Sequence, residues 1–379
     1  MLDMSHSCPY YWRSPLKVHC RLFLAFGIIY RNGSTILKRP TQHDVARHAG
    51  VSRTTVSQVL NKRTNGTVPI SDETVQRVWQ AIADIGYQPD ARAQSLRSGS
   101  THTIGLLIPS IHNPHYWDYV EGAKQAAEDG GYHLLIAEGD LSGSDRQTAA
   151  SVLGRWALDG LIVTGLQGIP IEEGSPLDWL VKQTPLVDIN ILAGDKIDQV
   201  LVDYYAITLE IVDYLYSLGH RRIGLLYGPQ REDHGTDRLS GYRETMQKWG
   251  LYDEALIARC PMTMKDGYLA TQQLLQEQHP TALITINDML AIAAIRAATD
   301  SGLRIPQDLS IVGYDDIPMA EFMVPRLTTV SKDAVGMGRE AAKLLISQLQ
   351  QPERSSRQHV IIKPCLVVRE STAEAPTKP

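Results

Sequence analysis

The polar side chains of one short segment, residues 52–60, are of the kinds that read the edges of DNA bases. Arg53 carries a guanidinium and Gln58 an amide, and both groups form paired hydrogen bonds with bases in a major groove. Thr54 and Ser57 add short hydroxyl groups. On a helix, the apolar residues of this segment fall on one face and leave the polar groups on another. The segment therefore predicts a helix that presents hydrogen-bonding groups to DNA.

Two helices joined by a tight turn are expected to position those groups. Thr41 caps the first helix, and Asp44, three residues later, completes a capping box. Gly50 ends this helix, because glycine tolerates the left-handed backbone of a sharp turn. Ser52 then caps the second helix. Such a helix-turn-helix occurs in DNA-binding proteins and also as a purely structural corner.

A third helix is expected to support the first two. It begins near Ser71, with Asp72 and Glu73 in its first turn, where the helix dipole favours acids, and it stops at Gly86. Its apolar side chains are expected to supply the core of this small domain: Val75, Val78, Trp79, Ile82 and Ile85.

Charge is divided unevenly along the chain. Residues 38–100 contain nine Lys and Arg against five Asp and Glu, whereas residues 101–379 contain 24 against 36, and the whole chain carries −5. A basic module joined to an acidic body is typical of a nucleic-acid reader whose body must not adhere to phosphate. The charge pattern therefore favours DNA binding over a structural corner.

The body after Thr101 alternates between apolar strands and helices. Strands are expected at IGLLIPS, YHLLIAEGD, DGLIVTG and PLVDIN in a first lobe, and at RRIGLLYGP, TALITIND and LSIVGYDD in a second. HVIIKPCLVVRES is expected to close the fold as a strand hairpin or pair. This alternation, repeated twice, predicts two doubly wound parallel sheets with a ligand cleft at the carboxyl ends of their strands.

Polar side chains follow most of these strands and are candidates for lining that cleft. Arg238 has the clearest case, because a lone cation at a helix start is not placed there for the helix dipole. His115 and the pair Asn287-Asp288 suit helix caps equally well, and Asp315 suits a turn braced with Asp316. The other candidates are Asn113, Tyr116, Asn190, Glu232, His234 and Met262.

Several motifs resemble those of the lactose/galactose repressor family (LacI/GalR) of bacterial transcription regulators. They are AGVSRTTVSQVLN, IADIGYQPDARAQSLRSGSTHTIGLLIP and SLGHRRIGLLYGP, in the family's order, and the resemblance extends from about Arg39 to about Glu370. It implies an all-α helix-turn-helix domain and hinge helix, followed by a two-lobed α/β domain like that of periplasmic binding proteins. It also implies a dimer or tetramer on a near-palindromic operator and a small-molecule site in the larger domain. RLTTVSKDAVGMGREAAKLLISQL looks like the strand and helix by which the family's chain returns to the first lobe.

The resemblance assigns roles to individual residues. Base-reading positions fall on Arg53, Thr54 and Gln58, and positions of phosphate or auxiliary contact fall on Thr55 and Ser57. The hinge segment reads DARAQSLRSG, and the leucine that wedges into the minor groove corresponds to Leu96, for which an ordinary buried leucine is the alternative. The effector positions fall on His115, Tyr116, Asn190, Glu232, His234, Arg238, Met262, Asn287 and Asp315.

The chain departs from the family pattern in places. Gln94 stands where an Arg is common, which removes one phosphate or minor-groove contact. Residues 202–205 read VDYY, without the usual Asp-Asn and following Gly, so the helix start facing the cleft is unusual. Glu232 stands where some relatives hold a cation, which favours an uncharged sugar or a cation-bearing ligand over a phosphorylated one. A sugar is therefore the expected effector.

The expected boundaries are an extension at 1–37, the helix-turn-helix domain at 38–87, the hinge and linker at 88–100, the effector and dimerisation domain at 101–370, and a tail at 371–379. In the extension, the apolar run LFLAFGII is too short to span a membrane and lacks the cleavage site of a secretory signal. A start site assigned upstream of the true one is the preferred explanation, and a disordered or cryptic extension is the alternative. The four cysteines show neither metal-ligand spacing nor a need for disulfides.

The function expected is that of an effector-controlled transcription regulator, a repressor, acting in the cytoplasm at the nucleoid as a homodimer or tetramer, without cofactor or metal. The alternative is a transport-type sugar-binding protein, which shares the two-lobed fold but has no use for the basic module. A sugar hydrolase would need two catalytic carboxylates, for which Asp203, Glu232, Asp288 and Asp315 are available. No catalytic motif accompanies them, so an enzyme is not expected.

Overall fold

The structure is a computed structural model of the full chain, and it describes only part of it. The described residues are 40–60, 70–88, 95, 99–139, 157–164, 173–174, 176–190, 196–228, 238–354 and 356–377. The chain forms two compact units that divide between residues 90 and 91, and each unit is treated separately below.

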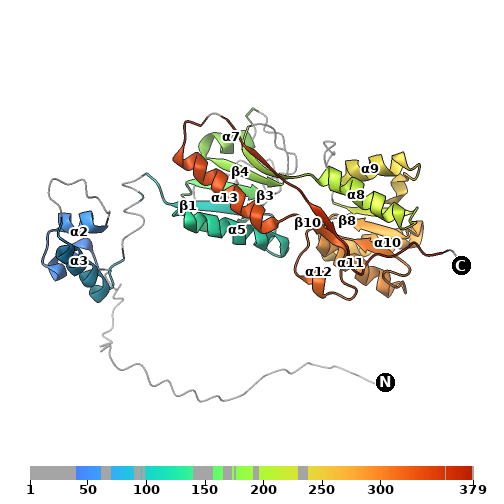
Figure 1. The fold of residues 1–379 in the computed structure, drawn as a ribbon, viewed down its shortest axis with the longest axis horizontal. Helices are drawn as coiled ribbons and strands as arrows, with labels where there is room; N and C mark the ends of the chain where they lie inside the picture. Colours follow the sequence, from blue (N-terminus) through green and yellow to red (C-terminus); the bar gives the residue numbers. More distant parts are fainter. Residues whose placement is uncertain are drawn as a thin grey trace, which may run out of the picture. The chain divides into compact units, whose positions relative to one another are not determined.

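The described part of the first unit is a small helical domain (Figure 1, blue). Its helices are α1 (Gln42–Ala49), α2 (Arg53–Leu60) and α3 (Asp72–Ile85). Their buried side chains form one core, made of Val45, Ala46, Ala49, Val56, Val59, Val78, Ala81 and Tyr87. This core fixes α2 against the other two helices.

The helix ends follow the signals in the sequence. The Asp44 carboxylate accepts hydrogen bonds from the backbone N and the Oγ1 of Thr41, at 2.9 and 2.7 Å. Gly50, after α1, has the left-handed φ of 65° that the turn requires. Ser52 Oγ accepts from the backbone N of Thr55 at 3.0 Å, and Ser71 caps α3. The predicted start of each helix is therefore confirmed.

One predicted core residue of this domain is wrong. The Trp79 side chain is 49% exposed, whereas Val78 beside it is fully buried. Successive residues of a helix point about 100° apart, so a helix that buries Val78 turns Trp79 outward. Ala81, farther along the same helix, lies in the core.

The second unit contains two lobes, each built on a parallel sheet (Figure 1). In the first lobe the strand order is β11-β5-β4-β3-β1-β2. These strands are β1 (Thr103–Ile108), β2 (His133–Glu138), β3 (Gly160–Thr164), β4 (Leu186–Asn190), β5 (Asp198–Val202) and β11 (His359–Ile362). The accompanying helices are α5 (His115–Asp129), α7 (Pro176–Gln183) and α13 (Ala334–Gln350).

Helices α5 and α13 lie side by side on the first lobe, at close range (Figure 1). A Cβ at Gly122 of α5 would collide with the backbone of Val335, and a Cβ at Gly338 of α13 would collide with the backbone of Tyr119. Glycine is therefore required at both positions for this contact. The sequence prediction that the chain returns to the first lobe through a strand and a helix is confirmed by α13.

The second lobe has the strand order β7-β6-β8-β9. These strands are β6 (Ile223–Tyr227), β7 (Ile257–Arg259), β8 (Ala282–Thr285) and β9 (Ser310–Val312). Its helices are α8 (Tyr204–Ser217), α9 (Arg238–Lys248), α10 (Met264–Gln278), α11 (Asp288–Asp300) and α12 (Met319–Phe322), with a short 3-10 turn, η1, at Glu254–Leu256. The predicted pair of doubly wound parallel sheets is confirmed.

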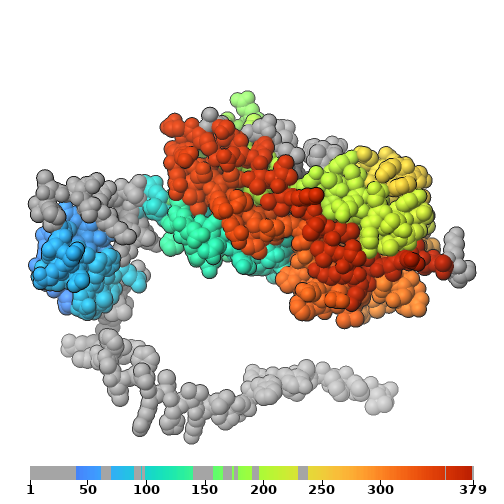
Figure 2. Space-filling model, in the orientation of Figure 1, coloured from blue at the N-terminus to red at the C-terminus, as the bar shows by residue number. Residues whose placement is uncertain are grey.

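The last strands differ from the predicted hairpin or pair. Strand β11 adds to the first-lobe sheet, parallel to β5, whereas β12 (Cys365–Val367) pairs antiparallel with β10 (Thr329–Ser331). The two strands thus find separate partners, because Lys363-Pro364 separates them as the chain passes from one lobe toward the other. Figure 2 shows this C-terminal segment, in dark red, at the surface across the junction of the lobes.

Packing of the second lobe continues past Glu370. Ser371 is fully buried and exchanges backbone and side-chain hydrogen bonds with Ile311. Farther on, the backbone N of Ala375 donates to the carbonyl of Leu218 at 2.8 Å. Residues that were assigned to a tail therefore belong to the packed lobe. Among the described helices, none combines the length and the apolar character needed to cross a membrane.

Candidate functional site

The first candidate site is the face of α2 that points away from the domain core. Val56 and Val59 anchor one side of the helix, with 0% and 7% of their surface exposed. Arg53 and Thr54 are exposed on the other side, and Ser57 and Gln58 are half-buried. The helix therefore presents its N-terminal end and its polar side chains to a partner, as groove-reading helices do.

Thr55 has a local role in this helix. Its backbone N and its Oγ1 both meet Ser52 Oγ, at 3.0 and 2.9 Å. Thr55 thus takes part in the cap of α2. Leu96, the expected minor-groove wedge, lies outside the described residues.

The second candidate site lies where the lobes meet and is centred on a buried ion pair. Lys332, between β10 and α13, donates from Nζ to Asp315 Oδ1 at 2.9 Å and to the hydroxyl of Tyr204 at 2.7 Å. Only 1% of the Lys332 side chain and 5% of the Asp315 side chain are exposed. Burial opposes ionisation of Asp315, but the cations Lys332 and Arg238 outweigh it and hold its pKa below the usual range. Burial likewise opposes the charge on Lys332, and Asp315 outweighs that, so the pKa of Lys332 is raised.

Arg238, the first residue of α9, lies near this ion pair. Its guanidinium carbon lies 3.6 Å from the ring centre of Tyr204 and 4.7 Å from that of Tyr314. Such cation–π contacts hold an Arg without consuming its hydrogen-bond donors. Within the described part of the chain, the buried Nε of Arg238 has no hydrogen-bond partner.

His115, the first residue of α5, approaches the ion pair from the first lobe. Its Nδ1 lies 4.0 Å from Asp315 Oδ1, and its Nε2 is 2.8 Å from the hydroxyl of Tyr119. Burial lowers the pKa of His115 to about 3, so the ring is neutral near pH 7. The ring points into the junction, so His115 does not act as the cap of α5. We refer to His115, Tyr204, Arg238, Tyr314, Asp315 and Lys332 as the junction cluster.

The backbone of Asp315 has an unusual conformation. Its φ of 114° lies in the region that favours glycine. Strain of this kind persists where the surroundings demand it and often marks functional sites. Asp316, which was expected to brace a turn with Asp315, instead pairs with Arg369 at 2.7 Å. The strained turn therefore directs the two neighbouring carboxylates to different cations.

Asn287 and Asp288 serve the fold. Asn287 Oδ1 accepts from the backbone N of Leu290 at 2.8 Å, so its role as the cap of α11 is the one that the structure shows. Asp288 accepts from Thr329 Oγ1 at 2.6 Å and from the backbone N of Ile317 at 3.0 Å. Burial raises the pKa of Asp288 well above its usual range. Both carboxylate oxygens of Asp288 are thus occupied within the protein.

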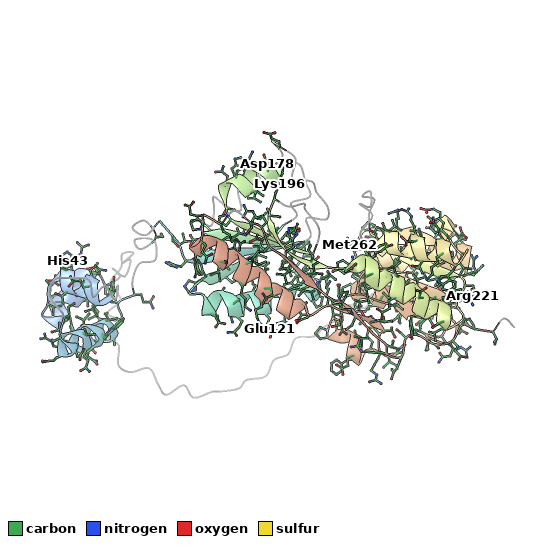
Figure 3. All side chains as sticks on the ribbon, turned by 45° about the horizontal axis from the view of Figure 1, so that its top comes forward. His43, Glu121, Asp178, Lys196, Arg221 and Met262 are labelled. Atoms are coloured by element: carbon green, nitrogen blue, oxygen red, sulfur yellow. The ribbon has the colours of Figure 1, made fainter. Side chains whose placement is uncertain are left out.

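The remaining predicted effector residues divide into two groups. Met262 is exposed and lies on the side of the second lobe that faces the first (Figure 3), and Tyr116 packs beside His115, 5.5 Å between ring centres. Asn113 Oδ1 accepts from the backbone N of His115 at 3.1 Å. The others lie outside the described residues: Glu232, His234 and the side chain of Asn190.

Sequence reasoning missed Lys332, Tyr204 and Tyr314. Lys332 directly follows a buried strand and precedes a helix, which is the same signal that identified Asp315. Tyr204 lies in the segment that departs from the family pattern, and it contacts both buried cations. A search for any polar residue at a strand end, including lysine and tyrosine, would have found all three.

The acids considered for hydrolysis have other partners. Asp203 caps α8 by accepting from the backbone N of Ala206 at 2.9 Å, and Asp288 and Asp315 are bonded as described above. A hydrolase needs two carboxyl groups that face a substrate. The described acids therefore do not form such a pair.

Comparison with known proteins places both units. The family described as bacterial regulatory proteins, lacI family, matches residues 41–90, and the periplasmic binding protein-like domain matches residues 212–372. These matches define the class of the protein: a lacI-type helix-turn-helix domain followed by a periplasmic-binding-protein-like α/β domain. The HTH-type transcriptional regulator DegA of Bacillus subtilis (strain 168) is 33% identical over 341 residues, covering 88% of this chain and 98% of DegA. The chain therefore belongs to the lacI family of bacterial regulatory proteins.

Solved structures agree with this assignment. A Lac repressor dimer bound to operator and the anti-inducer ONPF is similar with a TM-score of 0.74 and 26% identity, over 89% of this chain and all of that one. A complex of the transcriptional regulator CelR with cellobiose is similar with a TM-score of 0.63 and 30% identity, over 88% of this chain and all of that one. The family resemblance and the fold class predicted from the sequence are thereby confirmed.

Proposed function

We propose that this chain represses transcription by binding a near-palindromic operator as a homodimer, under the control of a small-molecule effector of the sugar class. The effector is proposed to bind between the lobes of the second unit. One observation carries the proposal: the chain combines an exposed, polar helix α2 in its first unit with a cluster of buried charges where the lobes of its second unit meet. The first can read DNA, and the second can respond to a ligand.

Operator recognition is supported by the geometry of the first unit. Arg53, Thr54 and Gln58 lie on a helix whose other face is fixed in a core. A fixed helix presents its side chains in one register, as direct readout of bases requires. Thr55, Ser57 and Leu96 are proposed to make the phosphate and minor-groove contacts. The Lac repressor structure, which contains operator, is consistent with this use of the fold.

Dimerisation is supported by apolar groups at the surface of the second lobe. Phe322, at the end of α12, is 81% exposed, Val324 is 95% exposed and Met319 is 42% exposed. Neighbouring apolar side chains at a surface commonly mark a protein interface. A two-fold dimer would also match the symmetry of a palindromic operator.

Effector control is supported by the junction cluster, because His115 belongs to the first lobe and Asp315 to the second. A ligand that prefers one arrangement of the lobes shifts the equilibrium toward it, and thereby changes operator affinity. The CelR complex contains a sugar, cellobiose. His115, Tyr116, Asn190, Glu232, His234, Arg238, Met262, Asn287 and Asp315 remain the proposed effector residues. We propose action in the cytoplasm, at the nucleoid.

The alternative of a transport-type sugar-binding protein loses its support. Such a protein has no use for a helix-turn-helix domain, and the lacI family matches that domain here. Catalysis is not proposed, since the described acids have structural partners.

Selection of randomised duplex DNA on the purified full chain, at near-physiological salt, tests the proposal. We expect enrichment of a two-fold symmetric site with a flexible central step. The same selection at high salt is the control, because binding driven by phosphate alone is lost as salt rises. Enrichment of no sequence, with binding that depends only on salt, would overturn the proposal.

A further inference from the structure

The junction cluster contains more positive than negative charge. Arg238 and Lys332 are cations, whereas Asp315 is the carboxylate that faces them. His115 is neutral near pH 7, because burial lowers its pKa to about 3. The cluster as described therefore carries one net positive charge in a largely buried position, which is costly unless something compensates it.

The neighbouring acids are engaged elsewhere. Asp316 pairs with Arg369, and both oxygens of Asp288 accept hydrogen bonds from Thr329 and Ile317. The pKa of Asp118, in the first turn of α5, is raised chiefly by burial and by Glu121, while Lys332 lowers it. Among the described contacts, Lys332 forms its ion pair with Asp315 and not with Asp118. None of these described acids neutralises the cluster.

The cluster also contains hydrogen-bonding atoms without a bond. The Nε of Arg238 and the Nδ1 of His115 are buried and have no hydrogen-bond partner in the described part of the chain. His115 is 3% exposed, so solvent does not supply one. Buried polar groups are nearly always bonded, and an exception calls for a ligand or an ordered water. The excess positive charge and the nitrogen atoms without hydrogen bonds thus both indicate a ligand that is negatively charged and forms hydrogen bonds.

We propose that the effector carries a carboxylate that binds against Arg238, as the carboxylate of a sugar acid would; this inference rests on the proposed function and specifies its ligand. A guanidinium and a carboxylate form paired, charge-assisted hydrogen bonds. A single negative charge balances the single excess positive charge, whereas a phosphate dianion would leave an excess of the opposite sign. The tyrosines on which Arg238 lies hold the guanidinium in place before the ligand arrives.

The proposal revises the uncharged sugar or cation-bearing ligand expected from the sequence. That expectation depended on Glu232, which lies outside the described residues. It also omitted Lys332, whose charge changes the balance at the junction.

The test is calorimetric titration of the full chain with matched acids and neutral sugars. The pairs are galacturonate with galactose, glucuronate with glucose, and gluconate with glucitol, and glucose 6-phosphate serves as a dianion. We expect at least one acid to bind at least tenfold more tightly than its neutral partner and than the phosphate. Arg238→Gln should abolish that preference. The matched control is Arg221→Gln, because Arg221 also lies over a tyrosine, 3.8 Å from the ring centre of Tyr216, but at the far end of the second lobe (Figure 3).

The outcomes separate this inference from the proposed function. Binding of a neutral sugar or the phosphate at least as tight as that of every acid, or no binding of any acid, overturns the inference. Operator affinity is measured with each ligand that binds. A neutral sugar that binds at least as tightly as every acid and alters operator affinity contradicts the inference and supports the proposed function. An acid that binds without altering operator affinity supports the inference and contradicts effector control.

Discussion

Arg53 and Arg238 are each the first residue of a helix, yet their surroundings differ completely. Arg53 is exposed to solvent at the start of α2. Arg238 lies over two tyrosines at the start of α9, close to a buried Lys–Asp pair. One arginine is therefore available to a macromolecule that approaches from solvent, and the other to a small molecule enclosed by protein. The residue type and its place on the helix do not decide this; the partners from distant parts of the chain do.

The largest expected effect is the loss of free energy of unfolding when a buried charge is removed from the junction cluster. Lys332→Met removes two buried hydrogen bonds of the Nζ ammonium, to Asp315 and to the hydroxyl of Tyr204, and should lower the free energy of unfolding by about 3 kcal/mol. The control is Lys182→Met, because Lys182 makes an equally short contact with Asp178, at 2.8 Å, but its side chain is 61% exposed. That change should cost clearly less than the loss of Lys332, because an exposed ion pair is weakened by solvent. Urea unfolding of both variants measures the difference, and equal costs would contradict the view of the junction as a dry site.

The pH dependence of stability should depend on the junction as well. The pKa of His115 falls to about 3 on folding, so below about pH 6.5 the unfolded chain binds a proton that the folded chain does not. The free energy of unfolding should therefore decrease as the pH falls from about 6.5 toward 3, by up to about 1.4 kcal/mol per unit. His115→Gln should flatten this dependence between pH 6 and 4.5. His133→Gln, at an exposed position of β2, should not, and a flattening of the same size in both variants would disprove the assignment.

A substitution on the exposed face of α2 should change the base preference of DNA binding and hardly change the free energy of unfolding. Arg53→Ala should relax base preference at one position of each half-site, by about 1–3 kcal/mol of discrimination. Repeating the DNA selection with this variant measures the change, and Arg47→Ala, in the last turn of α1, serves as the control. An unchanged consensus would show that α2 does not read the bases as placed.

The smallest expected effect concerns the support of α2. Ser71 Oγ accepts from the backbone N of Thr74 and caps α3, which packs against the other helices of the first unit. Ser71→Ala should cost about 1 kcal/mol of stability in that unit, and Ser71→Gly only a few tenths. Thermal unfolding followed by a signal from the first unit distinguishes them. A loss of only a few tenths of a kcal/mol in Ser71→Ala as well would mean that the cap contributes little.

Local signals predicted the elements well, because each depends on near neighbours in the chain. The capping box of Thr41 and Asp44 and the left-handed Gly50 appear as expected. The predictions that Trp79 is buried and that the last two strands form a hairpin or pair were wrong, because both features depend on which surface packs against these residues. The site residues were predicted incompletely for the same reason. Lys332 becomes part of it only because β10 brings it to Tyr204 and Asp315, which are distant in sequence.

The measurement that most directly tests the division of labour between the two regions is operator affinity, by fluorescence anisotropy, with and without a ligand that binds the junction. For the unaltered chain we predict a change of roughly five- to 150-fold on adding ligand, the usual range of such coupling. Arg238→Gln should keep operator binding and lose the response, whereas Arg53→Ala should lose sequence preference and keep ligand affinity. An operator affinity that does not depend on ligand, or an Arg53→Ala variant that no longer binds ligand, would contradict the central claim that α2 reads DNA and the junction cluster controls it.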